Sequence, residues 1–437
     1  MRSIMLNNRC PHYRTTPGII SIAAFAASGI IGICLPGYAV SASAKAPTRV
    51  LSVGVLAPAS GNTAASGKDM KDGWNYWFAN NGTTFGATTI RTSFYDTASS
   101  PNTSLTKARQ AVEKDHVDIL VGTLLSSSAL AIVPYASKHK IPYLIPETGA
   151  DDLAQRSRSK YAIKAGGWNS SQPAHVAGAW AYEHGYRKAV TIVSGYAFGY
   201  ENSGGFSQVF HDAGGKIAEH LFPPLGTKDF SPYLSRIRNA KPDVVFATLV
   251  GADGQSFLKQ WTSFGLSKEI PLINTQTTTD QSNMREGDPA IFDGLISVGY
   301  YAPGRDDPVT QDFVKGYAAK YGSIPDSHAA SMYLTAQWLS KAVESLPANA
   351  TTDQLIDAIN RVTFANTPFG PYKLDEYGGP VFNVYLMKVV PTPDSLKKYG
   401  AVWNVVERKW DDVSQFWTYD PKTYLKQPVY SESFQGY

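Results

Sequence analysis

From Val50 onward the chain repeats one hydrophobic pattern many times: a short apolar run, a turn, and then an amphipathic segment. The runs that we interpret as buried strands span residues 50–57, 89–97, 117–122, 142–146, 188–195, 243–251 and 294–301. Strands that alternate with helices in this way are typical of parallel sheets covered by helices. The pattern therefore predicts an α/β fold.

The segments between these strands carry signs of helices. Large apolar side chains recur at helical spacing after the first run, at Met70, Trp74, Trp77 and Phe78. We expect this stripe in the core rather than against a ligand. Ser-Pro pairs at 100–101 and 231–232 predict two helix starts, because serine caps a helix and proline is tolerated in its first turn.

The loops that follow the strands are where a ligand site is expected. In open α/β sheets, ligands bind beyond the carboxyl ends of the strands, where helix amino termini offer unpaired N–H groups and a partial positive charge.

The first 44 residues have the features of an export signal. Three arginines precede an uncharged stretch from Gly18 to Leu35, and small residues at 42–44 predict cleavage after Ala44. The alternative is an uncleaved membrane anchor, since the stretch is near the roughly 18-residue lower limit for a span. Lipid attachment at Cys34 is disfavoured because Ile33 is bulkier than the residue that usually precedes such a cysteine.

Cleavage would leave 393 of the 437 residues. That length exceeds the roughly 250 to 300 residues at which one hydrophobic core stops growing, so we expect two lobes. Both cysteines, Cys10 and Cys34, lie in the signal, which leaves no disulfide or thiol chemistry to the mature chain. The three signal arginines account for most of the formal net charge of +4. The remaining charge is too small for a nucleic-acid-binding surface.

Several stretches resemble a known family. In the first half they are APASGNTAASGKDM and DTASSPNTSLTKARQAVEKDHVDILVGTLLSSSALAIVPYA. In the second half they are VSGYAFGYENSGGFSQVFHDAGGKI and FPPLGTKDFSPYLSRIRNAKPDVVF, where Gly-Thr-x-Asp-Phe-Ser is distinctive. From Val50 to Val390 the chain resembles the branched-chain amino acid binding proteins, which are type I periplasmic receptors.

The resemblance implies two Rossmann-like lobes joined by three crossovers, near Gly166, Tyr300 and Gly379. Lobe 1 would contain residues 48–166 and 301–379, and lobe 2 residues 167–300 and 380–437 with a C-terminal extension. A small organic solute would bind between the lobes and close the hinge. The implied protein is periplasmic and monomeric, takes no cofactor, and serves the permease subunits of an ABC importer.

The resemblance places one group of ligand-binding residues in lobe 1. Ser126, with Ser127 beside it, matches a serine that binds the ligand carboxylate at a helix amino terminus; the alternative is that these serines only cap the helix. Glu147, Thr148 and Gly149 match the loop that completes the anion site. Gly149 replaces the usual hydroxyl residue, and Glu147 would repel a carboxylate. Glu147 therefore either faces solvent or meets a hydrogen-bond donor of the ligand.

Aromatic residues form a second group, in lobe 2. Tyr196, Phe198 and Tyr200 lie where the family places an aromatic side chain against the ligand, although ordinary packing is expected for at least one of them. Leu249 or Val250 occupies another contact loop. Aromatic walls favour apolar or planar ligands.

Three further residues complete the expected site. Gln276 aligns with the acidic residue that grips an α-ammonium group, and a neutral amide would hold ammonium more weakly. Trp168 and Gln172 follow the first crossover and are expected at the cleft edge, although Trp168 could equally be a buried hinge residue. The expected solutes are therefore amino acids, aromatic acids, or amide- and urea-like molecules.

Catalysis has little support in the sequence. There is no HExxH, GxSxG or Walker motif and no metal-spaced Cys/His cluster, so we expect neither an enzyme nor a bound metal. His116 in KDHVD is interpreted as an exposed turn residue. Two alternatives stay open: a sensory module that reports its ligand to a membrane signalling protein, and an unfamiliar hydrolase that uses Asp96 or Glu147.

Overall fold

The structure is a computed structural model and describes residues 48–437; the predicted export signal and both cysteines lie outside these residues. A first, six-stranded sheet has the order β2-β3-β1-β4-β5-β6. Its strands are β1 (Arg49–Ala57), β2 (Thr84–Phe85), β3 (Thr88–Asp96), β4 (Ile119–Gly122), β5 (Tyr143–Leu144) and β6 (Ala162–Ile163). The helices of this lobe are α1 (Ala64–Asn81), α2 (Pro101–Arg109), α3 (Ser126–His139), α10 (Pro308–Tyr321), α11 (Ser327–Glu344) and α12 (Thr352–Arg361).

A second sheet has the order β12-β13-β11-β10-β9-β7-β8, with β14 paired to β13. Its strands are β7 (Lys188–Val193), β8 (Lys216–Leu221), β9 (Val244–Thr248), β10 (Leu272–Thr275), β11 (Ile296–Gly299), β12 (Tyr372–Leu374), β13 (Pro380–Pro391) and β14 (Val402–Val413). The helices after residue 170 that belong with it are α4 (Ser171–Glu183), α5 (Ala197–Asp212), α6 (Ser231–Ala240), α7 (Ala252–Ser263), α8 (Gln281–Glu286), α9 (Pro289–Phe292) and α13 (Pro421–Tyr424). Short 3-10 segments lie at 151–153, 266–268 and 397–399, and α2 continues as a π-helical turn at 110–114.

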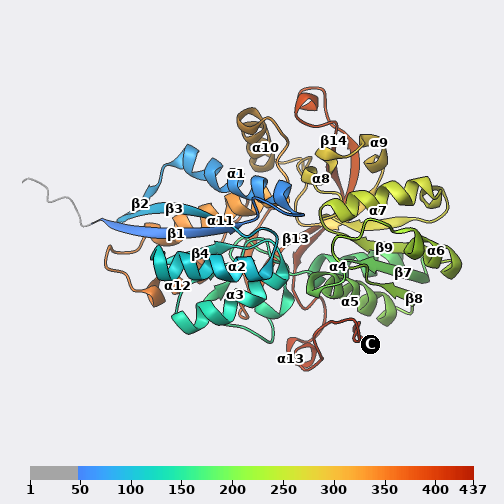
Figure 1. The fold of residues 1–437 in the computed structure, drawn as a ribbon, viewed down its shortest axis with the longest axis horizontal. Helices are drawn as coiled ribbons and strands as arrows, with labels where there is room; N and C mark the ends of the chain where they lie inside the picture. The colour runs from blue at the N-terminus through green and yellow to red at the C-terminus, as the bar shows by residue number, and fades with distance from the viewer. Residues whose placement is uncertain (1–47) are drawn as a thin grey trace, which may run out of the picture. The chain divides into compact units, whose positions relative to one another are not determined.

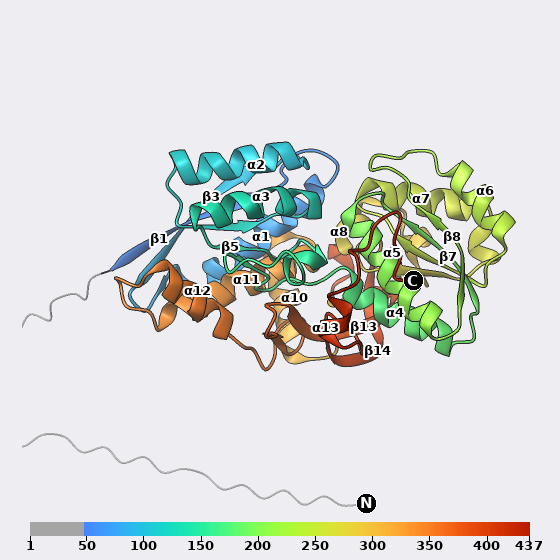
Figure 2. The same cartoon turned by 90° about the horizontal axis from the view of Figure 1, so that it is seen from below.

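The chain builds the first lobe from two separate stretches of sequence. Figures 1 and 2 show α11 and α12 beside the blue and cyan elements that begin the chain, and α11 packs along α1. Gly73 permits this close approach, because a Cβ there would lie 2.0 Å from the carbonyl oxygen of Ala329. The predicted two-lobed α/β fold is confirmed.

The sheets differ from the prediction at their edges. Strands β1, β3, β4, β5 and β6 are parallel, as are β7 to β11, whereas β2, β12, β13 and β14 run antiparallel to their partners. Because Tyr372 pairs with Phe382, β12 belongs to the second sheet. The third crossover, which is the third passage of the chain between the two sheets, therefore precedes Tyr372 and does not lie near Gly379 as predicted.

The predicted helix start at Ser100 is confirmed, whereas Ser231 is not the capping residue of the second helix. Ser100 caps α2 and accepts a hydrogen bond from Thr103 N–H (3.4 Å). Ser231 is already the first residue of α6, and its N–H and hydroxyl both donate to the Asp229 carboxylate (2.9 and 2.6 Å). Trp74 is fully buried as expected, and His116 is exposed as expected, in the loop that precedes β4. Within residues 48–437, no helix is both long and apolar enough to cross a membrane.

One buried histidine gives a prediction about acid stability. His175 on α4 is completely buried, and burial lowers its pKa to about 3. An unfolded chain would bind a proton there near pH 6.5, so the histidine destabilises the folded state progressively as the pH falls from 6.5 towards 3. Between pH 6.5 and 4.5 we expect the wild type to lose about 2–3 kcal/mol relative to a His175→Gln variant, at about 1.4 kcal/mol per unit. Urea unfolding of both proteins at the two pH values measures this difference, and equal pH dependence would contradict it.

Candidate binding cleft

A cavity lies among the loops at the carboxyl ends of strands from both sheets. It contains about 460 Å³ of empty space, part of it open to solvent. The lining residues come from the loops that follow β1, β4, β5, β6, β7, β9 and β10 and from the starts of α1, α3, α5, α8 and α11. Strands of both lobes thus direct their carboxyl ends at one space, as the fold class predicts.

Six of the predicted site residues line this cavity: Ser126, Glu147, Gly149, Trp168, Tyr196 and Phe198. Of the two alternatives Leu249 and Val250, it is Val250 that lines the cavity. Leu249 is instead buried in the core beneath the second sheet.

Four other predicted residues do not line the cavity, and three of them make structural contacts instead. Thr148 donates its hydroxyl to the carbonyl of Thr123 (2.7 Å). The Gln172 amide donates to the carbonyls of Pro380 and Val413 (2.8 and 2.6 Å), which fastens the start of α4 to the second sheet. Ser127 is only half-buried and lies outside the lining, and the Tyr200 ring packs edge-on against Phe222 (5.1 Å between centroids).

Gln276 is also turned away from the cavity. Its side-chain oxygen accepts the N–H groups of Tyr300 (2.8 Å) and Tyr301 (3.0 Å). The residue lines a separate small cavity, on the other side of Trp168. In this position Gln276 cannot grip an ammonium group in the main cavity.

The helix amino terminus predicted to bind an anion is present at α3. Ser126 is its first residue, and the capping position is Leu125, which can provide no side-chain cap. The interpretation that Ser126 or Ser127 merely caps the helix is therefore wrong. Ser126 is 2% exposed, and its hydroxyl finds no hydrogen-bond partner among residues 48–437. A buried hydroxyl without a partner at a helix amino terminus is suited to receive a ligand oxygen.

The Glu147 carboxylate does not face solvent, and one of its two oxygens already has a partner within the protein. Its Oε2 lies 2.6 Å from Nδ1 of His328 at the start of α11, and its side chain is fully buried. Burial raises the pKa of Glu147, and the His328 charge offsets part of that rise. Burial lowers the pKa of His328, but the charges of Glu147, Asp326 and Asp280 outweigh it and raise the pKa to about 10. His328 therefore carries a proton at neutral pH, and its charge balances that of a Glu147 carboxylate, which would otherwise repel a ligand carboxylate.

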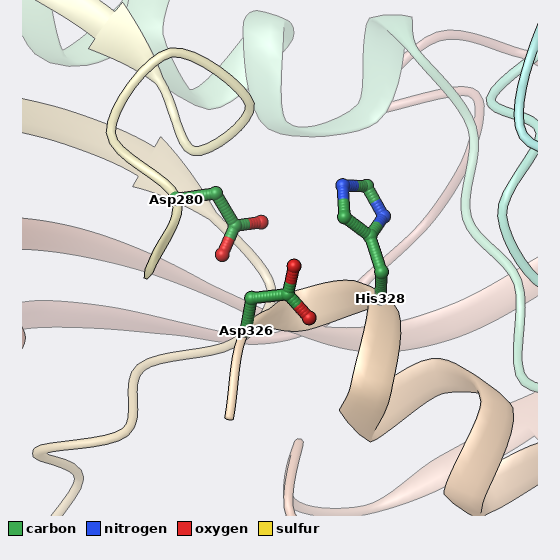
Figure 3. A group of neighbouring side chains, drawn as sticks. All are labelled: Asp280, Asp326 and His328. Atoms are coloured by element: carbon green, nitrogen blue, oxygen red, sulfur yellow. The ribbon is translucent and has the colours of Figure 1, made fainter. Parts of the chain in front are cut away.

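Asp280, Asp326 and His328 are the one group among the described residues that could hold a metal ion. Figure 3 shows the two carboxyl groups turned toward each other beside the imidazole. Most of their ligand atoms already have protein partners, although Oδ2 of Asp326 has none among the described residues. Asp280 caps α8 and accepts from the N–H and hydroxyl of Ser327, and Asp326 caps α11. These contacts explain the group as helix capping across the two lobes, and we assign no metal to it.

Aromatic rings form one wall of the cavity. Trp168 meets Phe198 edge-on at 5.7 Å, and Phe198 lies 5.8 Å from Tyr196. The indole N–H of Trp168 donates to the carbonyl of Glu147 (3.1 Å), and its ring also packs on Tyr300 (5.0 Å). Trp168 is therefore both a cavity wall and a buried hinge residue, the two roles that the sequence left open.

Several lining residues were not predicted. They are Thr63, Ser66, Leu124, Leu125, Gly251, Thr277, Ser282, Asn283 and His328. Thr63, Ser66, Leu124 and Leu125 come directly after predicted strands, so their position in the chain was a signal that could have found them. Thr277, Ser282 and Asn283 follow β10, a strand that was not predicted. His328 had no comparable signal, because it lies 181 residues from its partner Glu147. Asp96, considered for hydrolysis, instead organises a turn by accepting from the N–H groups of Ala59 and Ala98.

Comparisons with known proteins agree with this geometry. The sequence profile of a family described as periplasmic binding protein matches residues 50–395. The Leu/Ile/Val-binding protein homolog 6 of Brucella melitensis is 28% identical over 363 residues, which cover 81% of this chain and 91% of the relative.

Solved structures give the same result. An ABC transporter substrate-binding protein from Sphaerobacter thermophilus is 30% identical with a TM-score of 0.76, covering 84% of this chain and 99% of that one. A solute-binding protein of an ABC transporter from Rhodopseudomonas palustris BisB5, in complex with 3,4-dihydroxybenzoic acid, is 26% identical with a TM-score of 0.78, covering 84% and 98%. The predicted resemblance is confirmed, and so is the expectation that the protein is not an enzyme. The chain belongs to the periplasmic binding protein family, the extracytoplasmic substrate-binding proteins of ABC transporters.

Proposed function

We propose that this protein captures a small aromatic carboxylate in the interlobe cavity and delivers it to the permease subunits of an ABC importer. The single observation that carries the ligand class is the cavity wall of Trp168, Phe198 and Tyr196 facing the free Ser126 hydroxyl. The proposal includes export by a signal cleaved after Ala44, a periplasmic location and a monomeric state.

The carboxylate end of the ligand is assigned to the start of α3. Among the described residues that line the cavity there is no lysine or arginine, and His328 is already paired with Glu147. A carboxylate must then be held by the Ser126 hydroxyl and the first N–H groups of the helix, where the helix dipole is positive. The aromatic rings stack against the rest of the ligand.

An α-amino acid fits this cavity less well. An ammonium group needs accessible acceptors, yet Gln276 is turned away and the Glu147 carbonyl already accepts from Trp168. The Glu147 carboxylate leaves its Oε1 without a partner among the described residues, but His328 balances its charge. A relative crystallised with 3,4-dihydroxybenzoic acid supports the aromatic class, whereas other relatives are named for leucine, isoleucine and valine.

Thermal unfolding of the mature chain against a panel of solutes tests this proposal. The panel holds benzoate, 4-hydroxybenzoate, 3,4-dihydroxybenzoate, phenylalanine and leucine. A ligand at 100 times its dissociation constant stabilises the folded state by about 2.7 kcal/mol, which raises the midpoint by several degrees. We expect such shifts with one or more of the benzoates and not with the amino acids. The proposed ligand class would be wrong if only leucine or phenylalanine raised the unfolding midpoint, or if none of the benzoates raised it.

A further inference from the structure

The C-terminal segment 414–437 leaves β14 and contacts the hinge and both lobes. Figures 1 and 2 show it running past α13 to the chain end near α4 and α5. Its aromatic residues form a small core of their own, built on Phe416, Tyr424 and Tyr430. We call this segment the C-terminal strap.

At the hinge, the strap places Gln415 between the first passage that joins the lobes and the turn that connects β12 to β13. The Gln415 side chain is fully buried, accepts from Nδ2 of Asn169 (2.8 Å) and donates to the Asp375 carboxylate (2.8 Å). Asn169 lies in the first passage, between β6 and α4, and Asp375 follows β12. Gly379 makes room for this side chain, because a Cβ there would lie 2.0 Å from the Gln415 amide.

The hydrogen bonds continue from Gln415 to the wall of the binding cavity. The buried Lys164 ammonium donates to Oδ1 of Asn169 (2.5 Å) and to the carbonyl of Trp168 (2.7 Å). Gln415 is thus joined through Asn169 and Lys164 to the backbone of the residue that lines the cavity with its indole.

Arg156 fastens the strap to lobe 1. This residue lies between β5 and β6 of the first sheet. Its Nε donates to the carbonyl of Gln427 (2.9 Å), and its Nη2 donates to the carbonyl of Tyr424 (3.0 Å). The guanidinium also lies 5.7 Å from the centroid of the Tyr424 ring.

Helix α5 fastens the strap to lobe 2. The Tyr430 hydroxyl donates to Gln208, and the Tyr419 hydroxyl donates to Asp212 (2.7 Å). Gly204 on the same helix lets the Tyr430 ring lie close, since a Cβ there would be 2.2 Å from the ring.

From these contacts we infer that the C-terminal strap limits how far the two lobes open and thereby sets ligand affinity. Hinge opening moves the lobes as rigid bodies, so it must break the hydrogen bonds of the strap either with Arg156 or with α5. Because breaking these hydrogen bonds costs free energy, the strap favours the state in which the lobes are together. A ligand that binds only that state has an apparent dissociation constant inversely proportional to its population. The effect on affinity rests on the proposed function; the effect on lobe opening does not.

Arg156→Ala tests the strap, with Arg361→Ala as its control. Arg361 is a residue of the same type in the same lobe, and its Nε donates to the carbonyl of Asp357 in its own helix α12 (3.1 Å), a hydrogen bond that does not cross between the lobes. Because cysteine occurs only at positions 10 and 34, labels can be placed at Thr106→Cys on α2 and Asn239→Cys on α6, both exposed sites. Fluorescence energy transfer between them reports the distance between the lobes without any ligand.

We expect Arg156→Ala to lower energy transfer in the ligand-free protein and to raise the dissociation constant of the bound solute about three- to tenfold. Arg361→Ala should change neither quantity. Tyr419→Phe, which removes one hydrogen bond to α5, should shift both quantities in the same direction but by less, and it replaces Arg156→Ala if that variant does not fold. Unchanged energy transfer in Arg156→Ala and Tyr419→Phe, or an equal change in Arg361→Ala, would overturn the inference. If no panel solute binds, the proposed function is wrong, but the energy-transfer measurement still tests whether the strap limits lobe opening.

Discussion

A His328→Gln variant is expected to unfold with a free energy about 3–5 kcal/mol below that of the wild type at pH 7. The reason is the buried Glu147 carboxylate, which loses the cation 2.6 Å away and is left charged in the protein interior. Glutamine can still donate one hydrogen bond, but it cannot balance the charge. Urea unfolding with equal slopes for the two proteins measures the difference.

The double variant Glu147→Gln/His328→Gln separates charge from packing. With both charges removed, no unpaired ion is left, so we expect at least half of the lost stability to return. The wild type should also lose stability as the pH rises from about 6.5 to about 10, because over this range the unfolded chain has released the His328 proton while the folded state, whose neighbours raise the pKa of His328 to about 10, still holds it. If His328→Gln were as stable as the wild type, or if the double variant were less stable than His328→Gln, the Glu147–His328 pair would not be ionised.

The strand pattern predicted much of the fold, and its failures have a common cause. Each buried parallel strand is an apolar run of its own, so β1, β4, β7, β9 and β11 could be found without knowledge of their neighbours. The pairing of β13 with β12 and β14 depends on which edge of the second sheet is free. Which edge is free is a property of the assembled sheet, and it cannot be predicted from the sequence around Gly379.

The site shows the same limit at the level of side chains. The family resemblance put Ser126 at a helix start that follows a strand, and Ser126 is the first residue of α3. The resemblance also put Gln276 near the ligand, but the N–H groups of Tyr300 and Tyr301 turn its amide inward. Glu147 raised an electrostatic problem whose solution, His328, lies on a helix of a distant stretch of the chain. Loop position follows from local sequence, whereas side-chain direction and charge balance follow from tertiary contacts.

Ser126→Ala is expected to raise the dissociation constant of the best benzoate of the panel about 10- to 100-fold. A hydrogen bond to a charged group contributes about 1.5–3 kcal/mol, and no lysine or arginine among the described lining residues can replace it. Ser127→Ala is the control, because Ser127 is the next residue of α3 but lies outside the cavity lining. We expect its dissociation constant to stay within about twofold of the wild type, as titration calorimetry would measure.

The neutral amide of the same ligand decides whether Ser126 acts on the carboxylate. The amide lacks the negative charge that the start of α3 favours, so wild-type protein should bind it more weakly than the acid. Ser126→Ala should then lose less affinity for the amide than for the acid, because a neutral oxygen forms the weaker hydrogen bond. An equal loss for both would mean that the substitution disturbs the cavity as a whole, and loss for neither would place the carboxylate elsewhere than at the free Ser126 hydroxyl.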